Sequence, residues 1–236
     1  MQEWKLKPAR DHGLSPGEQL RSTRREGGLI NTITSFGWYS FVRAYLRVYH
    51  RLTVEGRENL PASGPFVLVA NHASHLDALM LASSVSSRMR DRIFPIAAGD
   101  TFFSSPLTGI LAALFVNALP MWRRSRCTHA LEDLRERLTQ DQCIFVIFPE
   151  GTRTRTGTMG PFKAGLGMLV AGTDVPVVPC RIFGAYEALP HDRSWPRPVK
   201  LRLRIGTPLT FLSNSNDRAG WDVVARETES AVIRLN

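Results

Sequence analysis

Residues 66–77 have the sequence Phe66-Val67-Leu68-Val69-Ala70-Asn71-His72-Ala73-Ser74-His75-Leu76-Asp77, in which five apolar residues precede a polar turn. The apolar run is short, rich in β-branched residues and without alternation, as expected for an interior strand of a covered sheet. A second run of this kind, residues 143–147, precedes Phe148-Pro149-Glu150-Gly151-Thr152-Arg153. Because ligands and catalytic groups of open α/β sheets gather where strands end, the two polar segments predict one shared site.

Strand-like and helix-like segments alternate along most of the chain. We expect strands over residues 51–55, 66–70, 93–97, 115–119, 143–148, 175–180 and 200–205, and helices over residues 76–85, 106–114, 130–138, 164–171 and 221–233. This alternation predicts an α/β fold with a mixed, largely parallel sheet flanked by helices. The chain has 236 residues, of which 43% are hydrophobic and 22% charged, which suffices for one substantial core. We therefore expect a single folded domain over residues 53–236.

The N-terminal part of the chain differs in composition from the rest. Residues 1–27 are rich in Arg, Gly and Pro without periodicity, which indicates a flexible basic arm. Over residues 28–52 an apolar stripe recurs at helical spacing, formed by Ile30, Ile33, Gly37, Phe41, Tyr45, Val48 and Leu52. Gly37 is a candidate break in this amphipathic helix. Two alternatives remain open: the stripe binds a membrane interface, with the arginines facing anionic headgroups, or it packs on the domain core.

The net charge and the cysteine content indicate which partners and which cellular compartment to expect. A net charge of +9 favours anionic partners such as lipid surfaces and phosphorylated substrates. Nucleic acid is not expected, because the basic clusters lack interleaved aromatic residues for base stacking. The three cysteines are far apart, and residues 1–27 fit neither a secretory nor a transit signal. We expect a cytoplasmic protein that lies peripherally on the inner face of a membrane.

His72 and Asp77 are a candidate base and its orienting carboxylate. Five residues separate them, so His72 lies in the turn before the helix and Asp77 in its first turn. From there Asp77 can fix the tautomer of His72 so that the other ring nitrogen acts as base. Ser74 and Asp77 also match a capping box, and the two roles are compatible. His75 is a second candidate base, ranked below His72, and we expect no metal site because the remaining histidines are scattered.

Glu150 and Arg153 open a loop rich in glycine and threonine that continues to Gly157. Arginine binds phosphate bidentately, and threonine hydroxyls and backbone amides add further donors. The alternative is an ordinary solvated loop. The position of Glu150 directly after Pro149 and a buried strand favours a role in binding an anionic substrate.

These segments resemble the motifs of the glycerol-phosphate and lysophosphatidic acid acyltransferase family of phospholipid biosynthesis. The matching residues are Asn71, His72 and Asp77; Pro120 and Arg123; Phe148 to Arg153 in full; and Val175-Pro176-Val177-Val178-Pro179. The four blocks occur in the family's order over residues 52–208. The resemblance implies a single-domain glycerol-phosphate acyltransferase-like fold.

The resemblance also implies an enzyme that transfers a fatty acyl group from acyl-CoA or acyl carrier protein to the free hydroxyl of a lysophospholipid. The implied acceptor is 1-acyl-sn-glycerol-3-phosphate, which gives phosphatidic acid, without a cofactor. His72 would be the base and Asp77 its partner, and the implied substrate-binding residues are Asn71, Arg123, Glu150, Gly151, Thr152 and Arg153. The chain departs from the family pattern at Gly99 and Trp122. Two alternatives follow: the same chemistry on a lyso-aminolipid or a natural-product alcohol or amine, and a lipid-binding homologue without catalysis.

Overall fold

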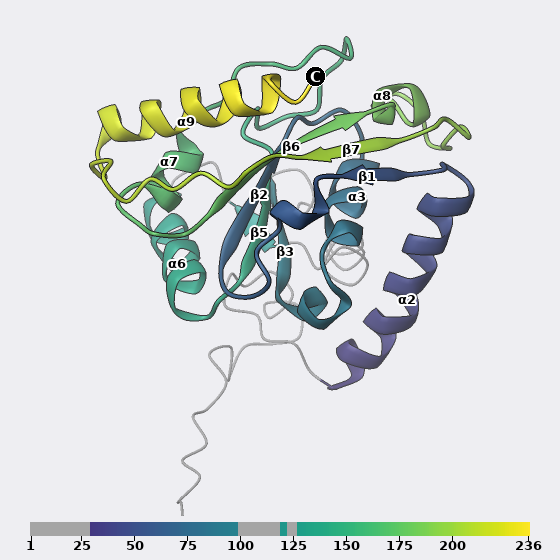
Figure 1. The fold of residues 1–236 in the computed structure, drawn as a ribbon, viewed down its shortest axis with the longest axis horizontal. Coiled ribbons are helices and arrows are strands. Elements are labelled where there is room, and N and C mark those ends of the chain that lie inside the picture. The colour runs from purple at the N-terminus through teal and green to yellow at the C-terminus, as the bar shows by residue number, and fades with distance from the viewer. Residues whose placement is uncertain (1–28, 99–118, 122–126) are drawn as a thin grey trace, which may run out of the picture.

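The computed structural model describes residues 29–98, 119–121 and 127–236. Within them, seven strands form one sheet in the order β1-β7-β6-β2-β5-β3-β4 (Figure 1). The strands are β1 (Thr53–Glu55), β2 (Phe66–Ala70), β3 (Ile93–Ala98), β4 (Leu119–Met121), β5 (Ile144–Ile147), β6 (Val177–Phe183) and β7 (Arg202–Ile205). Neighbouring strands are parallel except for β6 and β7. The predicted mixed, largely parallel sheet is confirmed.

Helices cover both faces of this sheet. The helical elements are α2 (Leu29–Val48), η1 (Arg57–Asn59), α3 (Leu76–Ser84), η2 (Ser87–Arg92), α6 (Cys127–Gln140), α7 (Gly165–Val170), α8 (Ala185–Ala188) and α9 (Arg218–Ile233). Figure 1 shows α2 and α3 on one side of the central strands and α6, α7 and α9 on the other. The short elements η1, η2 and α8 were not predicted. The helix predicted over residues 106–114, the arm over residues 1–27 and all but the last residue of the strand over residues 115–119 lie outside the described residues.

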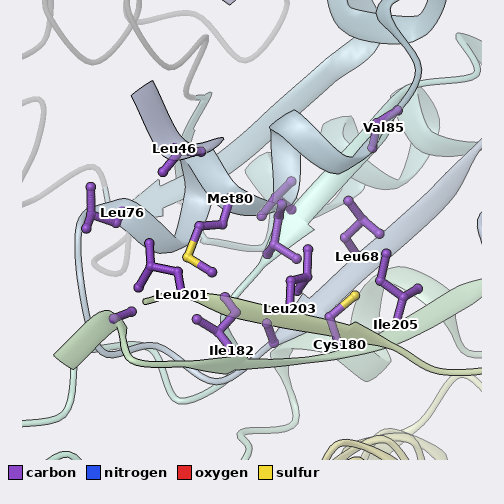
Figure 2. Packing of buried hydrophobic residues seen from close by; sticks show 14 of the residues in the cluster. Leu46, Leu68, Leu76, Met80, Val85, Cys180, Ile182, Leu201, Leu203 and Ile205 are labelled. Carbon is purple, nitrogen blue, oxygen red and sulfur yellow. The ribbon is translucent and has the colours of Figure 1, made fainter. Parts of the chain in front are cut away.

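The hydrophobic core is divided by the sheet into two clusters. All five residues of β2 are buried, which confirms the interior strand predicted from the run without alternation. Because successive side chains of a strand point to opposite faces, Leu68 packs with α3 and α2 while Val67 and Val69 pack with α6, α7 and α9. Figure 2 shows the first cluster, which includes Met80 of α3 and Leu201. The polar segments that follow the strands are therefore attached to a sheet that is packed on both faces.

The helix α2 differs from the prediction in two respects. It runs through Gly37 without interruption, so the predicted break is wrong. Val42 and Leu46 are buried in the core and Trp38 and Tyr45 pack against it, whereas Phe41 is 60% and Val48 79% exposed. Of the predicted stripe, Gly37, Phe41 and Val48 are therefore exposed, whereas Tyr45 and Leu52 pack against the core. No described helix is long and apolar enough to cross a membrane.

Hydrogen bonds to the end of α3 explain the orientation of α2. Nε of Arg43 donates to the carbonyl of Ser83 at 3.0 Å, and its Nη2 donates to that of Val85. The hydroxyl of Tyr39 donates to the carbonyl of Ala82. The last carbonyls of a helix have no intrahelical partner and carry the negative end of its dipole, so a guanidinium there stabilises the helix. These bonds turn Tyr39 and Arg43 inward and leave Phe41 outside.

Candidate active site

The two polar segments identified in the sequence meet at one edge of the sheet. Strands β2 and β5 are adjacent and parallel, with Val69 opposite Ile147. His72 and Glu150 each lie three residues beyond this pair, and the backbone N–H of His72 donates to Oε1 of Glu150 at 2.7 Å. The backbone N–H of Thr154 donates to the carbonyl of His72 at 2.9 Å. The segments therefore lie side by side, as the sequence predicts.

His72 and Asp77 form a hydrogen-bonded pair. Nδ1 of His72 lies 2.9 Å from Oδ2 of Asp77, whose side chain is fully buried, while the side chain of His72 is 18% exposed. The same carboxylate oxygen accepts from the backbone N–H groups of Ala73 at 2.6 Å and Ser74 at 2.8 Å. One oxygen of Asp77 thus fixes both the imidazole and the turn that carries it.

The bond from Ser74 to Asp77 is half of the capping box considered in the sequence. The other half differs, because the hydroxyl of Ser74 accepts from the N–H of Leu76 at 3.2 Å, rather than from that of Asp77. Helix α3 begins at Leu76. Asp77 therefore acts in the start of the helix and in the orientation of His72 at once.

The imidazole of His72 is also fixed through its face. It stacks on the ring of Phe148, with centroids 4.1 Å apart and planes inclined by 12°. When Nδ1–H donates to the Asp77 carboxylate, the lone pair of Nε2 remains available. Across the described parts of the chain no residue hydrogen bonds with Nε2. A partly exposed ring nitrogen held in this way suits a general base.

Glu150 joins the two segments through backbone groups. Glu150 is 6% exposed. Its Oε1 accepts from the backbone N–H of His72, and its Oε2 accepts from the backbone N–H of Gly160 at 2.8 Å. Burial raises the pKa of Glu150, and the two backbone donors oppose this effect. Both carboxylate oxygens are therefore engaged in positioning His72 and the loop, and direct contact with a substrate stays a prediction.

Asn71 is engaged in a similar way. Its Nδ2 donates to the carbonyl of Ile182 at 3.0 Å, and the N–H of Ile182 donates to its Oδ1 at 2.9 Å. The side chain continues the pairing of β2 with β6 beyond Ala70 and Cys180. It fixes the first residue of the turn that carries His72, and its predicted contact with substrate stays a prediction.

The loop after Glu150 presents Gly151, Thr152 and Arg153. Gly151 has a φ of +73°, a left-handed conformation that glycine adopts without the strain of a side chain. Thr152 is exposed and Arg153 half-buried. The guanidinium of Arg153 makes no hydrogen bond or ion pair with any residue that the structure describes. Partial burial lowers the pKa of Arg153, while the charge of Asp77 opposes this effect.

His75 lies beside the same groups. Desolvation, together with the positive charges of Arg153 and His72, lowers the pKa of His75 to about 4. A base of this kind is weaker than an ordinary histidine, which supports ranking His72 first. Arg123 lies outside the described residues, and Pro120 lies in β4. In residues 29–98, 119–121 and 127–236 no group of three or more His, Cys, Asp or Glu side chains could hold a metal ion.

Two contributions to this site were not predicted from the sequence. The stacking of Phe148 on His72 depends on how two loops fold back, although Phe148 belongs to the second motif. The N–H of Gly160 belongs to no motif, and its bond to Glu150 closes the loop from residue 150 to residue 160. The two polar segments that directly follow buried apolar runs were the signal that placed His72 near Glu150.

The comparison with known families follows from the same residues. A family model described as Acyltransferase matches residues 51–183, which is more than half of the chain. The chain belongs to the acyltransferase family. The match includes both segments of the candidate site, so the family assignment rests on the residues that form it.

Individual relatives of this acyltransferase family member agree with the assignment. Human 1-acyl-sn-glycerol-3-phosphate acyltransferase beta is 31% identical over 157 residues, covering 66% of this chain and 54% of the relative. The chloroplastic 1-acyl-sn-glycerol-3-phosphate acyltransferase BAT2 of Brassica napus is 34% identical over 146 residues, covering 60% of this chain and 40% of the relative. The chain spans about half of the length of such curated relatives.

A solved structure shows a similar fold. The 1-acyl-sn-glycerophosphate acyltransferase PlsC from Thermotoga maritima superposes with a TM-score of 0.65 at 27% sequence identity, covering 84% of this chain and 77% of that chain. The acyltransferase-like fold expected from the sequence is confirmed.

Proposed function

We propose that this protein is an O-acyltransferase that transfers a fatty acyl group to the free hydroxyl of 1-acyl-sn-glycerol-3-phosphate and so forms phosphatidic acid. The observation that carries the proposal is the His72–Asp77 pair, in which Nε2 of His72 hydrogen bonds with no residue that the structure describes. The names of the relatives support the same acceptor. A thioester, in acyl-CoA or acyl carrier protein, is the proposed donor.

The proposed chemistry is a direct transfer. Nε2 of His72 takes the proton of the acceptor hydroxyl as its oxygen attacks the thioester carbonyl, and Asp77 stabilises the resulting imidazolium. The tetrahedral intermediate collapses, the carbon–sulfur bond breaks, and the thiolate takes the proton back from His72. An ester and a free thiol are the products.

The remaining site residues divide into two groups in this proposal. Arg153, with Gly151, Thr152 and Arg123, binds the phosphate of the acceptor, since a guanidinium with unused donors matches phosphate oxygens. Asn71 and Glu150 act by positioning the turn that carries His72. The enzyme would work on the cytoplasmic side of a membrane, where an anionic surface presents the acceptor.

The test is a reaction of the purified protein with acyl-CoA and 1-acyl-sn-glycerol-3-phosphate, followed by thiol release and product mass. His72→Ala is expected to lower turnover by about 10²–10⁴-fold, the usual contribution of a positioned base. The exposed His191→Ala serves as the control and should retain full activity. Full turnover in His72→Ala would exclude His72 as the base.

The acceptor assignment has its own test. Arg153→Ala should raise the KM for the phosphorylated acceptor while leaving kcat near the wild-type value, and the exposed Arg193→Ala should change neither. A lysophospholipid panel with amine-bearing and phosphate-free acceptors identifies the alternative chemistry. Equal turnover of a phosphate-free acceptor would contradict the role of Arg153. Absence of thiol release with every acceptor and donor would favour the lipid-binding homologue.

A further inference from the structure

A second candidate site lies at the opposite end of α3 from His72. A pocket of about 470 Å³ opens where α2, β1, η1 and the last turn of α3 meet, and its lining residues are Arg43, Arg47, Leu52, Val54, Arg57 and Ser83. Ser83 follows Asp77 by six residues, which corresponds to about 9 Å along a helix. The pocket is therefore separate from the proposed acyl-transfer site.

The polar part of the pocket is strongly cationic. Three of its lining side chains are arginines, and none of the described residues that line it is acidic. Arg43 is held by the carbonyls of Ser83 and Val85. The guanidinium groups of Arg47 and Arg57 make no hydrogen bond or ion pair with a described residue, so their donors remain available. Guanidinium groups gathered without a counter-ion attract anions and match phosphate oxygens bidentately.

The backbone under Arg57 is firmly fixed. Gly56 adopts a φ of +75° at the start of η1, and a Cβ there would lie 2.1 Å from the carbonyl oxygen of Ile205. Nδ2 of Asn59 donates to the same oxygen at 2.8 Å. Arg43 is fixed on the other side of the pocket by its bonds to α3. Two of the three cations are thus carried by anchored elements, which lowers the entropy lost on binding.

The apolar surroundings of the pocket distinguish between possible anions. Leu52 and Val54 form part of its lining, and α2, which carries Arg43 and Arg47, exposes Phe41 and Val48. Basic residues with exposed aromatic and aliphatic side chains on one helix are typical of a helix at a membrane interface. A soluble phosphate would use only the arginines.

We propose that this pocket binds the phosphate-bearing headgroup of an anionic phospholipid at a membrane surface. The phosphate lies between Arg47 and Arg57, and Phe41 and Val48 enter the interfacial layer. This goes beyond the acyl-transfer chemistry, because it assigns a lipid site that takes no part in the reaction.

Vesicle binding tests the proposal, with the full chain and without donor or acceptor. We expect co-sedimentation with vesicles of phosphatidylcholine and phosphatidylglycerol and much less with phosphatidylcholine alone. Arg47→Ala and Arg57→Ala should each weaken the partitioning about fivefold, as expected for one basic residue near an anionic surface. Arg226→Ala, on the exposed face of α9, removes the same charge and should have no effect. An equal loss in Arg226→Ala would overturn the proposal.

A second variant separates pocket binding from general surface charge. Leu52→Trp keeps every arginine but fills part of the pocket, and it should weaken binding to the mixed vesicles. Thermal unfolding and circular dichroism establish that the variant is folded, and Val54→Phe is the replacement if it is not. Wild-type binding by a folded pocket-filling variant would overturn the proposal. So would stabilisation by inorganic phosphate that needs Arg47 and Arg57 while vesicle binding does not, since that identifies a soluble ligand.

The outcome is independent of the proposed catalysis. His72→Ala should bind the mixed vesicles as the wild type does, because the base lies at the other end of α3. Loss of vesicle binding in Arg47→Ala with retained turnover of dispersed substrate supports the lipid site alone. Loss of turnover in His72→Ala tests the acyl-transfer proposal alone.

Discussion

Oε1 of Glu150 accepts a hydrogen bond from the backbone N–H of His72 at 2.7 Å, and Oε2 accepts one from the N–H of Gly160 at 2.8 Å. This carboxylate joins the ends of β2 and β5 by bonds to backbone groups 78 and 10 residues away. The position of the His72 imidazole therefore depends on Glu150. Among the described residues, the ring itself hydrogen bonds with Asp77 and not with Glu150.

Glu150→Gln should impair turnover by displacing His72. Glutamine offers one acceptor and places an amide N–H₂ against the second backbone donor, so one of the two bonds is lost. Misplacement of a catalytic group by about 1 Å can cost about 10²-fold in rate, and we expect a fall in kcat of this order with little change in the acceptor KM. Steady-state kinetics measure both, with the exposed Glu227→Gln as control. A raised acceptor KM at unchanged kcat would instead show that Glu150 contacts the substrate.

Asp77→Asn and Asp77→Ala should separate orientation of the base from capping of the helix. Asparagine keeps an oxygen for the N–H groups of Ala73 and Ser74 but loses the charge that stabilises an imidazolium, so kcat should fall by about 10²–10⁴-fold with a small change in stability. Alanine leaves both buried N–H groups without this acceptor, which costs about 1–3 kcal/mol for each. Kinetics and denaturant unfolding measure the two effects, with the exposed Asp174→Asn as control. Full activity in Asp77→Asn would show that Asp77 caps the start of the helix and takes no part in catalysis.

His75 should make the stability of the protein depend on pH. Its pKa is lowered from 6.5 to about 4 in the folded chain, so the unfolded state binds the proton more readily between these values. The contribution of neutral His75 to the free energy of unfolding is present above pH 6.5 and is lost as the pH falls to about 4. Melting temperatures across this window should decline less in His75→Gln than in the wild type or in His191→Gln. Parallel declines in all three proteins would contradict the lowered pKa.

Gly167→Ala should destabilise the contact between α7 and α9. A Cβ at residue 167 would lie 2.3 Å from Cα of Trp221, and backbone atoms at that distance must move. Overpacking of a core typically costs about 1–3 kcal/mol, and urea unfolding should show a loss in this range. Gly165→Ala, in the same helix, is the matched control because nothing lies within 4 Å of its added Cβ. A neutral Gly167→Ala would mean that α9 can shift without cost.

The interior of the sheet could be predicted because its signal is local. The runs that form β2 and β5 lack alternation, and their buried positions follow from that composition alone. Each run is followed directly by a polar segment, and because strand ends gather functional groups at one edge of a sheet, His72 and Glu150 are expected to lie close together. The α/β fold and the meeting of the two motifs were therefore accessible without coordinates.

The face of α2 and the roles of Asn71 and Glu150 could not be predicted in this way. Phe41 and Val48 follow a helical spacing as regular as that of Val42 and Leu46, and the choice between them is made by the bonds from Arg43 to the end of α3. Asn71 bonds with backbone groups 111 residues away. When a side chain bonds with a distant backbone group, the residues next to it in the sequence do not indicate that partner.

Helix α3 is bonded to functionally distinct parts of the molecule at its two ends. Arg43 and Tyr39 hold its last carbonyls, and Asp77 in its first turn holds the imidazole of His72. The helix has only nine residues and packs on the sheet through buried Met80 and Leu81. A displacement of α2 therefore has one of two effects. It breaks the hydrogen bonds to residues 82–85, or it moves α3 as a rigid body and changes the direction in which Nε2 of His72 points. The position of the N-terminal helix and the orientation of the His72 imidazole are thus linked through one short helix.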